Sequence, residues 1–131
     1  MILENVPLAR QLDFVFREIR DELAHLTSGT VFVQIRNNVI GKFGVRAFPA
    51  ESRGNQLEVM DSGLSEVHVQ SFRQTALESL KLKRWTHGEI LFEFAMKKNT
   101  LCTSIAFESN YNMASIFADA EKKRNLQYQN V

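Results

Sequence analysis

The feature that most constrains the fold is a pair of alternating patterns on either side of Lys98-Asn99. Side chains on a strand alternate between two faces, so a two-residue turn at Lys98-Asn99 would place both patterns on one face. We therefore predict an antiparallel hairpin with one mainly apolar face. Its matched residues are Ile90, Phe92, Phe94 and Met96 on the first strand, and Phe107, Ile105, Thr103 and Leu101 on the second.

Three other segments have apolar residues at steps of three and four, which predicts amphipathic helices. The first runs from Pro7 to Leu26. The second opens at Ser65, with Leu64 and Val69 as a hydrophobic staple, and the third runs from about Asn112 to Arg124. The apolar positions are Leu8, Leu12, Val15, Ile19, Leu23 and Leu26 in the first helix, Val69, Phe72, Ala76 and Leu80 in the second, and Met113, Ile116, Phe117 and Ala120 in the third.

A second hairpin is predicted from Thr30 to Phe48, with Val31, Val33 and Ile35 facing the core. A two-residue turn at Asn37-Asn38 would place Lys42 opposite Val33, in the core row. A five-residue loop from Asn37 to Gly41 avoids this and gives Gly41 a positive φ, so the longer loop is our prediction. A short strand near Gln56 to Met60 follows the Pro49-to-Asn55 loop.

These elements predict an α+β fold in the order α-β-β-(β)-α-β-β-α. We expect a single domain over residues 1–131, with an antiparallel sheet of four to five strands and helices packed on one face. The tail from about residue 126 is expected to be loose.

Composition narrows the classes of function. The 16 basic and 15 acidic side chains give a net charge of +1, too little for a long-range field that would attract nucleic acid or an anionic membrane. Cys102 is the single cysteine, which suits a reducing compartment. No secretory signal and no apolar run of about 20 residues is visible, so we expect a cytoplasmic protein without a membrane partner.

The sequence shows no motif for catalysis or for a cofactor. The three histidines, His25, His68 and His87, lack metal-ligand spacing, and Glu22-x-x-His25 occurs once, on a face typical of solvated charges. Cys102 fits a packed or idle thiol better than a nucleophile. We predict no catalytic residue, no metal and no cofactor, and favour a protein that is not an enzyme while leaving an enzyme open.

One face of the first hairpin interleaves aromatic and basic side chains, a pattern that can stack bases and hold phosphates. This makes a nucleic-acid-binding domain an alternative function, which the near-neutral charge disfavours. The candidate residues are Phe32, Arg36, Lys42, Arg46 and Phe48.

The leading hypothesis is a non-enzymatic protein-interaction module, such as an adaptor, a chaperone-like protein or a regulator. It would bury exposed aromatic surface against a copy of itself, as a homodimer, or against another protein. Ten phenylalanines are many for this length, and Phe14 and Phe16 both lie off the main stripe of the first helix. Trp85 beside Arg84 is a second candidate, since Trp and Arg are enriched in interfaces, although packing against the core explains Trp85 better. A small-ligand sensor remains a further alternative, and it would need a pocket around His87, Cys102 or Glu93.

The order of elements is similar to that of small secretion chaperones and of some toxin-immunity proteins. This resemblance covers the layout alone, without a shared motif, and such chaperones tend to be acidic whereas this chain is not. It implies the binding of protein clients, which agrees with the leading hypothesis.

Overall fold

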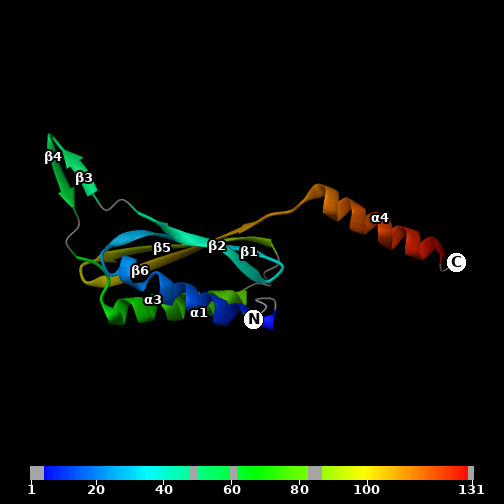
Figure 1. Ribbon diagram of the computed structural model, residues 1–131, viewed down its shortest axis with the longest axis horizontal. Helices are drawn as coiled ribbons and strands as arrows, with labels where there is room; N and C mark the ends of the chain where they lie inside the picture. The colour runs from blue at the N-terminus through cyan, green and yellow to red at the C-terminus, as the bar shows by residue number, and fades with distance from the viewer. Residues whose placement is uncertain (1–4, 48–49, 60–61, 83–86, 130–131) are drawn as a thin grey trace.

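The computed structural model describes residues 5–47, 50–59, 62–82 and 87–129, drawn as ribbon in Figure 1. The elements, in chain order, are α1 Leu8–Glu18, α2 Arg20–Leu23, β1 Ser28–Arg36, β2 Val39–Arg46, β3 Ala50–Arg53, β4 Gln56–Val59, α3 Glu66–Ser79, the short 3-10 helix η2 Leu80–Leu82, β5 His87–Lys97, β6 Thr100–Ser109 and α4 Met113–Gln129.

The predicted α+β fold is confirmed. An antiparallel sheet has the strand order β2-β1-β5-β6, and α1 and α3 lie side by side on one of its faces, here called the inner face (Figure 1). The opposite face is the outer face. The strand predicted near Gln56 is present as β4, but it pairs with β3, which occupies the segment predicted as a loop, and these two strands form a separate hairpin that projects from the main sheet.

The β5–β6 hairpin has the predicted register. Ile90 pairs with Phe107 at one end and Met96 pairs with Leu101 at the other. Lys98 and Asn99 form the turn with φ of 50° and 65°, as a two-residue turn between twisted strands requires.

The predicted five-residue loop between β1 and β2 is wrong. Asn37 and Asn38 form a two-residue turn, with φ of 51° and 62°, so that Ile35 pairs with Ile40. The register then shifts, and Val33 pairs with Phe43. One extra residue in β2 therefore forms a bulge, which removes Lys42 from the core row without a longer loop, and Gly41 has no positive φ.

Three phenylalanines form the centre of the core between the helices and the sheet. Phe16 of α1 lies 5.1 Å from Phe72 of α3 between ring centroids, and 6.2 Å from Phe92 of β5, both edge to face. This geometry is favoured by the ring quadrupoles. All six predicted stripe residues of the first helical segment are buried around them, although that segment breaks at Ile19 into α1 and α2.

Polar contacts fix α1 against its neighbours. Gln11 is buried, and its side chain accepts from the Ile40 N–H at 2.7 Å and donates to the backbone oxygens of Val6 and Asn38 at 2.9 and 3.2 Å. This amide therefore holds the β1–β2 turn onto α1.

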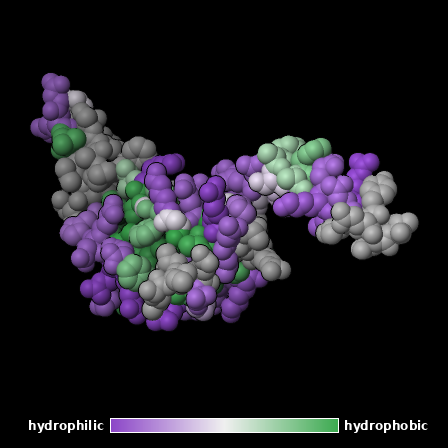
Figure 2. Space-filling model, turned by 45° about the vertical axis from the view of Figure 1, so that its right-hand side comes forward, coloured by the Kyte–Doolittle hydropathy of each residue, from purple (hydrophilic) through white to green (hydrophobic). Residues whose placement is uncertain are grey.

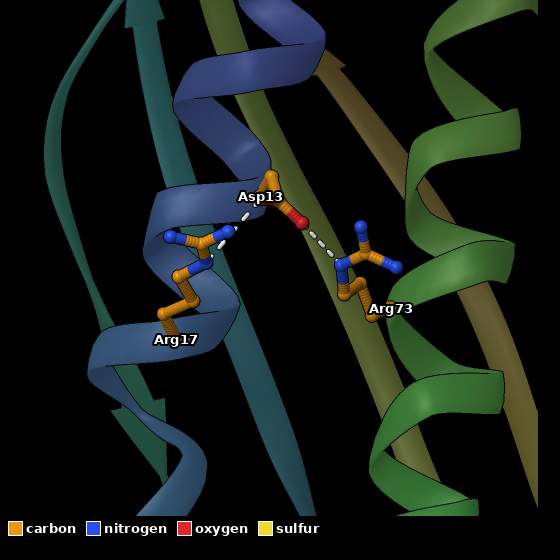
Figure 3. A network of polar contacts seen from close by, with 3 residues as sticks. All are labelled: Asp13, Arg17 and Arg73. Atoms are coloured by element: carbon orange, nitrogen blue, oxygen red, sulfur yellow. Dashed lines mark hydrogen bonds and ion pairs between the residues drawn. The ribbon is translucent and has the colours of Figure 1, made fainter.

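Asp13 links the two helices of the inner face. Its carboxylate accepts from the Arg73 guanidinium of α3, and it also lies 3.5 Å from Arg17 Nε on its own helix (Figure 3). Arg17 is exposed, whereas Asp13 and Arg73 are partly buried, so the contact with Arg73 is the one that joins two elements.

Each of the later helices begins at a polar cap. The Ser65 hydroxyl accepts from the His68 N–H at the start of α3, as predicted, and the Asn112 side chain accepts from the Ser115 N–H at 3.0 Å at the start of α4. α4 continues to Gln129 and extends away from the sheet (Figure 1).

Candidate functional site

Phe14 and Phe16, the two phenylalanines predicted to form an exposed patch on α1, have different environments. Phe14 is 57% exposed, but Phe16 is 1% exposed and lies in the core, which corrects the expectation that both could serve a partner. Successive residues on a helix point about 100° apart, so Phe16 falls beside Val15 and Leu12 on the inner side. Trp85 and Arg84 lie outside the described residues.

Phe14 lines a shallow hollow of about 530 Å³ between α1 and the β2 edge of the sheet. Its apolar wall is formed by Val6, Phe14, Val15, Ile40 and Phe43. Arg10, Asp13 and Arg17 line it as well, so this hollow combines an apolar wall with charged groups.

The predicted nucleic-acid residues lie on the outer face, but they do not form a free stacking platform. Phe32 is half-buried, with Lys42 Nζ 6.0 Å from its ring centroid. A Cβ on Gly44 would lie 2.7 Å from the Phe32 ring, so the ring rests on the neighbouring strand. Arg36 and Arg46 are exposed, and Phe48 lies outside the described residues.

Acidic side chains share the outer face with these cations. Thr30 pairs with both Arg46 and Glu93, and Gln34 pairs with Glu89. Glu89 in turn pairs with Glu108 on β6. Since side chains alternate along a strand, all of these residues project from the outer face. There the three glutamates lower the positive potential.

The three residues proposed for a ligand pocket line two different hollows. His87 lines an open hollow of about 1100 Å³ at the β1–β2 turn, whereas Glu93 and Cys102 line another of about 410 Å³. Cys102 pairs with Ala95, which lies eight residues beyond His87 along β5, roughly 25 Å at the usual rise of a strand. His87 is therefore too far from Cys102 to act as its base.

Metal-ligating side chains do not gather in the described part of the chain, where no group of three or more His, Cys, Asp or Glu side chains could hold an ion. The single Glu22-x-x-His25 pair lies on the exposed side of α2 and the turn after it, and His25 Nδ1 lies 2.8 Å from the Asp21 backbone oxygen. These residues fit the solvated face that the sequence indicates.

Among the described residues, one exposed apolar feature is a helical stripe that the sequence assigned to the core. We name residues Asn110–Gln129 the arm, and its predicted helical stripe projects into solvent rather than packing on the sheet (Figures 1 and 2). Phe117 is 64% exposed, and Figure 2 shows hydrophobic side chains gathered near the start of the arm. Its exposed large apolar residues are Tyr111, Met113, Ile116 and Phe117.

The total accessible surface is large because the arm and the β3–β4 hairpin both project from the main sheet. The chain exposes 9719 Å², whereas a folded monomer of 15.0 kDa is expected to expose about 7,000 Å². No helix in the described ranges is long and apolar enough to cross a membrane. Comparison with known proteins found no matching family model, no matching curated protein and no matching solved structure.

Proposed function

We propose that this chain is a non-enzymatic protein-binding module that docks onto another protein through its arm. The observation that carries the proposal is the stripe of α4, whose Met113, Ile116 and Phe117 side chains are exposed together on one side of the helix. A stripe of this kind normally packs against a protein surface.

The low stability expected for an unpacked α4 supports the same proposal. A 17-residue helix without tertiary packing is only marginally stable in water, because most helical stability comes from burial of the apolar side. Every described side chain of α4 is exposed except that of Glu121, which is half-buried. A bound protein would supply the missing packing.

The other functions considered have less support. An enzyme or ligand sensor is disfavoured because His87 and Cys102 line separate, open hollows. Nucleic-acid binding is disfavoured because Glu89, Glu93 and Glu108 share the outer face with its cations. The single cysteine supports a cytoplasmic setting as part of this proposal.

Photo-crosslinking in living cells tests the proposal. With p-benzoylphenylalanine in place of Phe117, we expect irradiation to give discrete covalent adducts with protein. Ala118 points about 100° away from Phe117 on the same helix, so the same residue at position 118 should give much weaker adducts. Equal yields at the two positions, or none at position 117, would contradict the proposal.

A further inference from the structure

We infer that the protein bound by the arm is a second copy of this chain, and that two copies exchange arms so that α4 of each packs along β6 of the other. This inference rests on the proposed function, since it names the partner of the same surface. Three observations carry it: the excess of exposed surface, an apolar edge on the inner face, and the absence of a charge barrier.

The excess of exposed surface is large enough to supply the area that an obligate dimer buries on each partner. The chain exposes 9719 Å², which is roughly 2,700 Å² more than expected for its mass. Obligate interfaces bury about 1,000 to 2,500 Å² on each partner. The projecting β3–β4 hairpin contributes to this excess as well as the arm, so packing of the arm on a second copy would remove part of the excess.

The acceptor surface is the edge of the inner face along β6. β6 is the last strand of the sheet, and its inner side chains are less well covered than those of β5. Ile90 and Phe92 of β5 are fully buried, whereas their partners Phe107 and Ile105 are 40% exposed and half-buried, respectively. We call Leu101, Ile105 and Phe107 the edge row.

The arm and the edge row belong to the same chain, so exchange gives a closed pair. Two copies related by a twofold axis would each donate one arm and accept one, and every exposed stripe would be matched. The connection from β6 to α4 is Asn110–Asn112, which is exposed and leads α4 away from its own sheet (Figure 1). A net charge of +1 offers no repulsion between copies.

Sedimentation equilibrium of the purified chain is the first test. We expect the wild type at micromolar concentration to have twice the chain mass of 15.0 kDa. Ile116→Glu places a charge in the stripe and should raise the dissociation constant by roughly a hundredfold, as loss of a central apolar contact does. Ala118→Glu adds the same charge on another side of α4 and should leave the dimer intact. A monomeric wild type, or equal effects of the two variants, would overturn the inference.

Disulfide trapping tests the exchange itself. In a Cys102→Ser background, a chain with Phe107→Cys and a differently tagged chain with Phe117→Cys should form a mixed disulfide after mixing and mild oxidation. A chain carrying both cysteines should then give a covalent dimer. An intrachain disulfide in a particle of monomer mass would show that the arm folds back on its own sheet, and no mixed disulfide would show that α4 does not reach β6; either result overturns exchange.

The two proposals fail in different ways. If the purified chain is monomeric but Phe117 still gives adducts with a different protein in cells, the second copy is the wrong partner and the protein-binding function stands. If neither a dimer nor any adduct forms, both proposals fail.

Discussion

At the β5–β6 turn, one residue occupies a backbone conformation that its side chain does not favour. Lys98 and Asn99 have φ of 50° and 65°, and positive φ is readily adopted by Gly and Asn but seldom by Lys. The turn could be located from the alternation on either side of it, since Lys98 itself is not a typical turn residue. The alternation of apolar residues therefore predicted this hairpin without help from the residue types in its turn.

Lys98→Asn should stabilise the protein by about 0.5 kcal/mol, because Asn adopts positive φ at lower cost. The melting temperature should rise by about 2 °C. Lys97→Asn, one residue earlier in the strand, is the control and should give no increase, since Asn is disfavoured in strands. A lower melting temperature for Lys98→Asn would contradict this account of the turn.

The two arginines that contact Asp13 should contribute differently to stability. Arg73→Ala should lower the free energy of unfolding by about 1–2 kcal/mol, because it breaks a partly buried charged hydrogen bond between α1 and α3. Arg17→Ala removes an exposed pair within one helix and should cost at most about 0.5 kcal/mol. Urea unfolding measures both variants, and equal losses would mean that the contact with Arg73 does not fix the helices.

At the scale of elements, the alternation of apolar residues predicts the register of two paired strands wherever neither strand contains a bulge. The β5–β6 register follows from alternation alone. The predicted length of the β1–β2 loop was wrong because an extra residue in β2 restores the alternation after a short turn. The alternation of apolar residues in a sequence cannot distinguish such a bulge from a longer loop. Gln11 was missed as well, because it contacts Asn38 and Ile40, which lie 27 and 29 residues away in the chain.

Gln11→Ala should lower the free energy of unfolding by about 2 kcal/mol, because it leaves the buried Ile40 N–H without its acceptor. Amide exchange at Ile40 should also become faster than in the wild type. Gln34→Ala, at an exposed position of β1, is the matched control and should change stability by less than about 0.5 kcal/mol. Unchanged exchange at Ile40 in Gln11→Ala would contradict this role for the amide.

At the scale of the whole molecule, the sequence predicted the helix of the arm but not its surroundings. A stripe at steps of three and four shows that one side of the first turns of α4 is apolar, and it carries no information about which surface covers that side. The sequence therefore gives no sign that Met113, Ile116 and Phe117 are exposed, and it points to Phe14 and Phe16 as the exposed aromatics instead. Tertiary packing separates the two cases, since Phe16 of α1 packs against Phe72 of α3 and Phe92 of β5.

The outer face should not retain nucleic acid. Its cations on β1 and β2 lie beside Glu89 and Glu93 of β5 and Glu108 of β6, and Lys42 lies near the Phe32 ring, so we expect no salt-dependent retention of the chain on single-stranded DNA or RNA at low ionic strength. Retention that falls steeply with salt, and is lost in Arg46→Ala, would contradict this expectation.

Hydrogen exchange in α4 tests the central claim, that a second chain covers the arm. At micromolar concentration the amides of residues 117–122 should exchange at least about a hundredfold more slowly than in an unstructured peptide, because packing against another chain protects them. Ile116→Glu should remove most of this protection and leave that of β5 unchanged. Exchange in α4 at the rate of an unstructured peptide, at every protein concentration and beside a protected β5, would contradict the claim.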